Sequence, residues 1–182
     1  MKRSEITRYQ QVVAELLDRA GVVLTPAERQ AIEIADFGLG EFERTGLGIV
    51  VYENNDRYCA KELVMLPGQT CSEHKHPPVG NDPGKRETFR CRAGEVYLYV
   101  AGPRSPAPRG KPPAGSEPHY TVFHEVVLRP GGQYTIPPDT LHWFQAGPAG
   151  AIVSEFSSPS RDEADIFTDP RIKRIPEVLE DS

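Results

Sequence analysis

Residues 68 to 94 read GQTCSEHKHPPVGNDPGKRETFRCRAG, and this stretch contains the first features that decide how the chain folds. His74 and His76 stand at positions i and i+2, so on a β-strand both imidazoles point to the same face. Glu87 begins the next β-rich run and can bring a carboxylate to the same point. Imidazole and carboxylate groups that converge in this way are typical ligands of a divalent metal ion.

A second stretch, residues 131 to 146, reads GGQYTIPPDTLHWFQA and adds a third imidazole. His142 opens a β-rich run shortly after the tight turn Pro137-Pro138-Asp139. Three imidazoles and one carboxylate suit a first-row divalent ion, which keeps open positions for a substrate when it is five- or six-coordinate. We therefore predict that one metal ion is bound by four side chains: His74, His76, Glu87 and His142.

Around these stretches, short β-rich runs alternate with turn residues from Leu47 onward. The turn signals combine proline, glycine, asparagine and aspartate, as in Pro67-Gly68 and Pro130-Gly131-Gly132. Six prolines mark residues 102–118 as an exposed connection between strands. The pattern predicts a mainly β chain folded as an antiparallel sandwich or barrel. The expected strands span residues 47–52, 58–66, 70–76, 87–92, 95–100, 120–128, 133–136, 141–146 and 151–156.

The N-terminal part has a helical pattern instead. Residues 4–20 carry apolar side chains at helical spacing, with Ser4 as the expected cap and Gly21 at the left-handed end. A second helix should begin after the capping residue Thr25 and end at Gly38. The sequence therefore predicts two N-terminal α-helices before the β-rich region.

These changes of pattern divide the chain into two parts. We expect residues 1–40 to form a helical extension packed on a barrel. Residues 41–182 should form that barrel. Its last segment, residues 158–182, has no clear period and is expected to wrap around the outside.

Composition limits the partners and the compartment. The net charge of −5 and the isoelectric point near 5.6 argue against nucleic acid or an anionic membrane as a partner. Cys59, Cys71 and Cys91 are odd in number and form no CxxC pair, so no disulfide framework is expected. The N-terminus is unlike a signal peptide, and no apolar run approaches the roughly 20 residues of a membrane span. A cytoplasmic protein is predicted.

The residues around the predicted ligands resemble the two sequence motifs of the cupin superfamily. Glycines lie six residues before His74 and seven after Glu87, and a proline lies five before His142. Asp139 departs from the pattern, because cupins usually have glycine there. The resemblance covers about residues 63–156. It implies a single cupin, a jelly-roll-like antiparallel β-barrel that carries a metal ion.

Further matches resemble the D-lyxose isomerase family of cupins. They are the long insert from Pro77 to Arg86 and the runs Thr88-Phe89-Arg90-Cys91, His142-Trp143-Phe144, Ser154-Glu155-Phe156-Ser157 and Thr168-Asp169-Pro170-Arg171-Ile172. This resemblance implies an aldose–ketose isomerase that converts D-lyxose to D-xylulose, and also D-mannose to D-fructose. It implies manganese as the metal, with cobalt, iron, nickel and zinc left open. A homodimer is expected by analogy, since cupin sheets often pair.

The reaction itself indicates which further residues to expect. Aldose–ketose isomerisation moves one proton between C2 and C1 and another between their oxygens, so it needs a metal to stabilise the enediolate and a base. Glu155, on the strand after the last metal ligand, is the candidate base. Lys85 shares the parity of Glu87 and should point inward, where burial and a nearby cation would lower its pKa for a role at a sugar oxygen. Asp169 and Arg171 are candidate substrate contacts at the barrel mouth.

Two neighbours of the ligands are expected to be structural. Cys71 has the wrong parity to join the two histidines of its strand and should pack as a small apolar group. Trp143 should be a structural ring, because residues 142 and 144 share the inward parity.

Other functions fit the same four ligands. A metal-dependent cupin dioxygenase would have a drier, more aromatic pocket than Lys85 and Glu155 indicate. A cupin-type phosphosugar isomerase needs cations aimed at a phosphate, whereas Arg86, Arg90 and Arg92 have outward parity. A metal-dependent sugar-binding module would leave Glu155 without a purpose.

Overall fold

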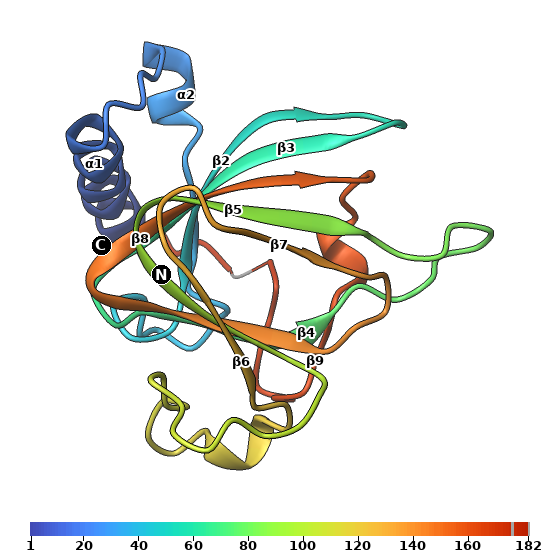
Figure 1. Cartoon of the computed structure of the whole chain (residues 1–182). Helices are drawn as coiled ribbons and strands as arrows, with labels where there is room; N and C mark the ends of the chain where they lie inside the picture. Colours follow the sequence, from blue (N-terminus) through green and yellow to red (C-terminus); the bar gives the residue numbers. More distant parts are fainter. Residues whose placement is uncertain (176, 182) are drawn as a thin grey trace.

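The computed structural model describes residues 1–175 and 177–181, and in it one antiparallel sheet curls around a central core (Figure 1). Within these residues the sheet has nine strands. They are β1 (Glu33–Ala35), β2 (Leu47–Asn54), β3 (Cys59–Met65), β4 (Thr70–Lys75), β5 (Glu87–Val100), β6 (His124–Leu128), β7 (Gln133–Ile136), β8 (His142–Ser157) and β9 (Ile166–Phe167). The helices are α1 (Arg3–Arg19), α2 (Pro26–Gln30) and the short 3-10 helices η1 (Glu117–His119) and η2 (Asp162–Ala164).

The two longest strands, β5 and β8, give the sheet its barrel-like shape. They pair along most of their length, from Glu87 opposite Ser157 to Val100 opposite His142. The first half of β5 also pairs with β7 and its second half with β6. The second half of β8 pairs with β3 and its first half with β4. The sheet thus folds into two layers, and the prediction of a mainly β, jelly-roll-like cupin barrel with two N-terminal helices is confirmed.

Glycines lie where β5 and β8 bend from one layer to the other. The sequence predicts separate strands on either side of these positions, but each long strand continues through them. Gly94 and Gly150 have φ of +70° and +76°, and a Cβ on Gly94 would lie 2.0 Å from the carbonyl oxygen of Gly150. The glycines that predict turns in the sequence therefore mark bends within two continuous strands. The strand pairing is irregular beside Gly94.

Alternate side chains of the strands fill the core between the layers. The inward row includes Leu63, Met65, Phe89, Phe144 and Val153. Cys71 belongs to the same core, so the expectation that its parity opposes that of His74 is wrong. Three residues of β4 span two residues of β8 between these positions, and this extra residue shifts the alternation. The Cys71 thiol is buried among apolar side chains, as predicted.

Helix α1 covers the outer face of the layer that contains β2 and β3. Its buried stripe meets apolar side chains of the sheet, with Tyr9, Val13 and Leu17 on the helix and Val50, Val64 and Ile152 on the strands. The helix begins at Arg3 with Lys2 at the N-cap, so Ser4 is not its cap. The Ser4 hydroxyl instead donates to the Asp181 carboxylate at 2.6 Å. Gly21 adopts φ +74° just beyond the helix, as predicted.

The second helix begins as predicted but ends early. The Thr25 hydroxyl accepts from the Glu28 N–H at 3.2 Å, and the Glu28 carboxylate accepts from the Thr25 N–H at 2.7 Å. Helix α2 ends at Gln30 and not at Gly38, because Glu33–Ala35 pair with β2 as strand β1. Sheet pairing outweighs the weak helical pattern there. The described part of the chain contains no helix with the length and hydrophobicity that a membrane span requires.

An aromatic cluster lies on the outer face of the other layer, beneath the proline-rich loop. The Trp143 ring packs with Tyr99 and Tyr120, and its indole N–H donates to the Val122 carbonyl at 2.7 Å. The Gly110 N–H of the loop donates to the Tyr99 hydroxyl at 2.6 Å. Trp143 is therefore a structural ring, as predicted, and it anchors the loop that covers it.

Glu62 on β3 points away from the core and is nearly buried. One carboxylate oxygen accepts from the Ser154 hydroxyl at 2.8 Å, and the other has no partner among the described residues. Burial raises the pKa of Glu62 above its usual value, although the Ser154 hydrogen bond and the charge of Arg92 lower it. Since the folded-state pKa exceeds the unfolded one, ionised Glu62 costs stability at neutral pH. That cost disappears below the unfolded pKa of about 4.3.

We expect Glu62→Gln to raise the melting temperature at pH 7 and to leave it nearly unchanged near pH 3.5. Glutamine keeps an acceptor for Ser154 and removes the desolvated charge. Thermal unfolding followed by circular dichroism across this pH range tests the expectation, with exposed Glu53→Gln as the control. A Glu62→Gln variant less stable than the wild type at pH 7 would contradict it.

Candidate metal centre and catalytic site

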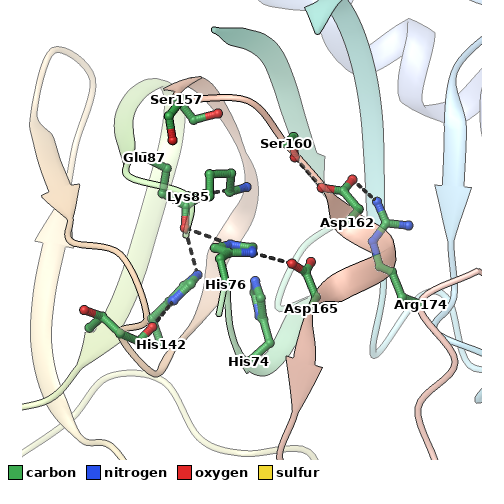
Figure 2. Close-up of polar contacts among 12 residues, drawn as sticks. His74, His76, Lys85, Glu87, His142, Ser157, Ser160, Asp162, Asp165 and Arg174 are labelled. Carbon is green, nitrogen blue, oxygen red and sulfur yellow. Dashed lines mark hydrogen bonds and ion pairs between the residues drawn. The ribbon is translucent and has the colours of Figure 1, made fainter. Parts of the chain in front are cut away.

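A cavity of about 400 Å³, including its opening to solvent, lies between the two layers. Its apolar lining comes from the core and includes Leu47, Ile49, Leu63, Phe89 and Phe144. Its polar lining consists of His74, His76, Glu87, Lys85, Glu155, Lys61, Asp162, Asp165 and Arg174, most of which are labelled in Figure 2.

Three imidazoles converge beside this cavity, and two of them, His74 and His76, line it. His74 on β4 and His142 at the start of β8 are cross-strand partners, and His76 directly follows the end of β4. The ring centroids lie 4.3 Å apart for His74 and His142, and 4.9 Å apart for His74 and His76. One ring nitrogen of each histidine lies within 4.8 Å of the others, so the three imidazoles could hold one metal ion.

Backbone carbonyls orient two of these rings. The Nδ1 atom of His74 lies 2.8 Å from the Ser72 oxygen, and that of His142 lies 2.9 Å from the Thr140 oxygen. A carbonyl oxygen only accepts, so each Nδ1 carries a proton. In the neutral ring, Nε2 is then the unprotonated atom and has the lone pair that a metal ligand needs.

The turn before β8 contains a residue in the left-handed conformation. Asp139 has φ +53°, at the position where cupins usually have glycine. Its N–H donates to the His76 carbonyl at 3.1 Å, and its carboxylate lies 2.7 Å from the Lys75 ammonium. These contacts hold the strained residue, so the departure from the cupin motif leaves His142 at the site.

Glu87 lies between two of the histidines (Figure 2). Its Oε1 atom is 3.2 Å from His76 Nε2 and 3.0 Å from His142 Nε2. All three atoms are buried, and none has a hydrogen-bond partner among the described residues. Buried acceptors that face one another without a proton or an ion are costly. A cation among them satisfies all three, so this donor set fits a divalent ion.

The surrounding charges prepare these groups for ligation. Burial alone raises the pKa of Glu87, but Lys85 and His76 lower it well below its usual value. Burial alone lowers the pKa of His76, but the Glu87 carboxylate raises it to about 9. Burial and the charges of the other two imidazoles lower the pKa of His74 well below its usual value. At neutral pH the Glu87 carboxylate is therefore ionised and the His74 imidazole is neutral, and these are the forms that bind a metal ion.

Lys85 connects Glu87 to Glu155. Its ammonium nitrogen lies 2.8 Å from Glu87 Oε2 and 3.0 Å from Glu155 Oε1. Burial alone lowers the pKa of Lys85, but Glu155 and Glu87 raise it well above its usual value. The expectation of a lowered Lys85 pKa is therefore wrong, because two carboxylates contact the ammonium directly. Lys85 is a charged hydrogen-bond donor in this cavity.

Glu155 faces the cavity from β8. Its cross-strand partners are Lys61 on β3 and Phe89 on β5. The side chain is buried, and its Oε1 atom accepts from Lys85 and, at 3.1 Å, from the Ser157 hydroxyl. A carboxylate thus lines the cavity that His74 and His76 also line.

Two relatives have names that describe sugar isomerases, whereas no family profile matches the sequence. The chain is 64% identical over 178 residues to the D-lyxose/D-mannose isomerase of Thermosediminibacter oceani, with 98% of each chain covered. It is 60% identical over 178 residues to the D-lyxose ketol-isomerase of Cohnella laeviribosi, again with 98% of each chain covered. The chain belongs to the D-lyxose ketol-isomerase family.

Solved structures of L-ribose isomerases resemble this member of the D-lyxose ketol-isomerase family. The ligand-free enzyme of Cellulomonas parahominis superposes with a TM-score of 0.83 at 18% identity, with 98% of each chain covered. The Acinetobacter sp. DL28 enzyme in complex with L-ribose gives a TM-score of 0.83 at 16% identity, with the same 98% coverage of both chains. At such identities the likeness concerns the fold alone, and it agrees with the cupin-type barrel.

In this D-lyxose ketol-isomerase family member, the segment after β8 completes the cavity. The expectation that residues 158–182 wrap the outside is therefore wrong for part of the segment. Asp165 Oδ1 lies 2.5 Å from His76 Nδ1 (Figure 2). Strand β9 pairs with β4, so Phe167 lies opposite His74 and stacks on its ring at 5.1 Å between centroids.

Charged side chains form another wall of the cavity, which the sequence did not predict. Asp162 lies 3.1 Å from the Lys61 ammonium and 2.5 Å from Arg174 Nη2, while Arg174 Nη1 lies 2.5 Å from Glu33. Burial alone raises the pKa of Asp162, but Lys61 and Arg174 lower it well below its usual value. The segment that supplies Asp162 and Arg174 has no periodicity. The one usable signal was the inward parity of Lys61 within a β-rich run.

Asp169 and Arg171, the predicted substrate contacts, are not part of the cavity lining. Arg171 Nη2 lies 2.6 Å from the Asp169 carboxylate and donates to the Ser116 hydroxyl at 2.8 Å. These contacts tie the C-terminal segment to the proline-rich loop. The guanidinium at the cavity belongs instead to Arg174.

Proposed function

We propose that this protein is a metal-dependent aldose–ketose isomerase that converts D-lyxose to D-xylulose and D-mannose to D-fructose. The observation that carries the proposal is the contact of Glu87 Oε1 with the Nε2 atoms of His76 and His142, beside the Lys85–Glu155 pair in one cavity. The names of the two relatives support the choice of sugars.

Four side chains are the proposed ligands, and manganese is the proposed ion, with cobalt, iron, nickel or zinc as alternatives. When bound, a divalent ion polarises the sugar carbonyl and stabilises the negative charge that develops on O1 and O2. The ligands carry one negative charge in total, so the occupied site stays positive and favours an anionic transition state. The ligands are His74, His76, Glu87 and His142.

Glu155 is the proposed base. Its carboxylate takes the proton from C2 of the aldose and delivers it to C1, which converts the aldose to the ketose. Oε1 accepts hydrogen bonds from Lys85 and Ser157, so Oε2 is the atom available for this proton. Glu155 is only 3% exposed, and this burial keeps the transferred proton away from bulk water.

Lys85 is the proposed partner of a sugar oxygen. Glu87 and Glu155 keep its ammonium charged, and a charged donor stabilises an oxygen on which negative charge develops. The second proton of the reaction moves from O2 to O1. Lys85 orients these two oxygens during that proton transfer.

Lys85→Ala should lower kcat and raise KM for the sugar by roughly 10- to 100-fold, because a hydrogen bond to a charged group is worth about 1.5–3 kcal/mol. Steady-state kinetics at saturating metal measure both constants. Lys111→Ala is the matched control, since Lys111 is an exposed lysine of the proline-rich loop that does not line the cavity. An unchanged KM in Lys85→Ala would contradict the assignment.

The remaining hydroxyls of the sugar are proposed to meet the charged wall. Lys61 and Arg174 offer N–H donors, and Asp162 offers carboxylate acceptors. Donors and acceptors side by side suit a polyol, whose hydroxyls both donate and accept. This wall lies in the same cavity as the metal ligands, which supports a small sugar as the substrate.

The composition of the cavity also weighs against the two alternative enzymes. Its lining includes seven charged side chains and four phenylalanines, so it is more polar than the pocket expected for a cupin dioxygenase. A phosphosugar isomerase needs uncompensated cations, but Lys61, Lys85 and Arg174 all pair with carboxylates. A neutral sugar fits this balance of charges better than a phosphate.

Metal analysis of the purified protein, followed by an aldose screen, tests the proposal. We expect about one equivalent of divalent metal per chain, turnover of D-lyxose and D-mannose, and loss of turnover after chelation that added manganese restores. D-Lyxose 5-phosphate and oxygen consumption serve as controls for the two alternatives. Metal-bound protein without any aldose turnover would overturn the isomerase proposal.

We further propose a homodimer in the cytoplasm. Tyr52 and Phe156 are exposed on the outer face of the sheet, which supports pairing of two such faces. Cys59, Cys71 and Cys91 are free and buried, which is consistent with a reducing compartment. Light scattering on the purified protein measures the oligomeric state.

A further inference from the structure

The three candidate ligand histidines differ in what holds their second ring nitrogen. His74 and His142 each donate from Nδ1 to a backbone carbonyl, that of Ser72 and of Thr140 respectively. His76 instead has its Nδ1 only 2.5 Å from a carboxylate oxygen of Asp165. His76 is therefore the one of these three imidazoles that a side chain orients.

Asp165 is well placed for this contact and buried enough to make it strong. Its side chain is 6% exposed, and His76 is equally secluded at 8%. Asp165 directly precedes β9, whose pairing with β4 fixes Lys75 opposite Ile166. Because His76 follows Lys75, the same short pairing brings carboxylate and imidazole together. A hydrogen bond to a buried charged group is stronger than one between neutral groups.

We propose that Asp165 is a positioning residue, whose carboxylate fixes the ring and tautomer of His76 so that Nε2 binds the metal ion. This inference rests on the metal centre of the proposed function. The carboxylate holds the proton on Nδ1, which leaves the Nε2 lone pair free and makes it a better electron donor. Glu87 Oε1, 3.2 Å from that Nε2, marks the side on which the ion would lie.

Two other roles for Asp165 are distinguishable from this one. As a purely structural ion pair it would affect folding but leave the metal affinity unchanged. As a sugar contact, which its place in the cavity lining allows, it would affect KM or kcat even when the metal site is saturated. A positioning residue acts through His76, so its loss weakens metal binding and excess metal restores turnover.

The test compares Asp165→Asn and Asp165→Ala with the wild type. We expect the dissociation constant for Mn²⁺, measured by chelator competition, to rise by roughly 10- to 100-fold in Asp165→Ala and by less in Asp165→Asn, which keeps an acceptor for Nδ1–H. Glu163→Gln, an exposed acid two residues away, is the matched control and should bind Mn²⁺ like the wild type. The visible absorption of Co²⁺-substituted protein should also change in both Asp165 variants.

Circular dichroism of each variant ensures that only folded proteins are compared. If Asp165→Ala does not fold, the comparison of Asp165→Asn with the wild type tests the proposal. Wild-type affinity and an unchanged Co²⁺ spectrum in both variants would overturn the proposal, as would a turnover defect that persists at full metal occupancy. These outcomes differ from those expected if the proposed function is wrong. If the proposed function is wrong, the wild type itself would bind no metal or turn over no aldose.

Discussion

Glu155→Gln should retain metal and sugar binding while kcat falls by roughly 10²- to 10⁴-fold, the usual contribution of a positioned acid–base group. The substitution preserves shape. The amide oxygen can still accept from Lys85 and Ser157, which contact Oε1 in the wild type. What the amide cannot do is take a proton from C2, so the loss should fall on kcat and not on the affinity for the sugar.

Steady-state kinetics with D-lyxose, together with metal analysis of the same sample, measure this effect. Glu62→Gln is the matched control, because it makes the same change at a buried glutamate outside the cavity. Isomerisation in deuterated water adds a second readout, since label at C1 of the ketose indicates proton transfer through a base. If Glu155→Gln ran at wild-type speed, the base would have to be another group of the cavity.

Replacing any one of the four proposed ligands with alanine should remove the metal and lower the melting temperature together. Bound metal stabilises the folded state by about 4 kcal/mol when the free ion is at 1,000 times its dissociation constant. For a chain of this size that corresponds to roughly 10 °C. The four variants are His74→Ala, His76→Ala, Glu87→Ala and His142→Ala.

Metal content by mass spectrometry and melting temperatures with and without chelator give the two measurements. His124→Ala is the control, since His124 bonds to the Pro103 carbonyl away from the cavity. Its metal content should match the wild type. Full occupancy in two of the four ligand variants would show that the ion is held elsewhere.

The parts of the fold that the sequence predicts are those with strict alternation. On β5 and β8, Glu87 and His142 open strands whose next inward positions could be counted from the motif, and the structure has Phe89 and Phe144 on the core side. The inward position of Glu155 could not be counted from His142, because the parity changes where β8 bends, and it was expected from the family resemblance. Because alternation is a local property of a strand, the sequence predicts which side chains face the core wherever the strand is regular. The convergence of the four proposed ligands could therefore be anticipated from spacing and from the cupin resemblance.

The errors arise where a long-range contact overrides a local pattern. The parity of Cys71 failed because β4 has an extra residue relative to β8, which no local signal marks. Residues 33–35 were predicted to be helical but form a strand, because they pair with β2. Asp162 and Asp165 were missed because they act from an aperiodic segment. Only its pairing with β4 brings that segment to the cavity.

The segment after β8 belongs to a separate part of the sequence from the rest of the cavity. Asp162, Asp165 and Arg174 all follow β8, whereas the three imidazoles, Glu87 and Glu155 lie within the chain up to the end of β8. A truncated chain that stopped at Ser157 would therefore keep every proposed ligand and the proposed base, and would lose one charged wall of the cavity.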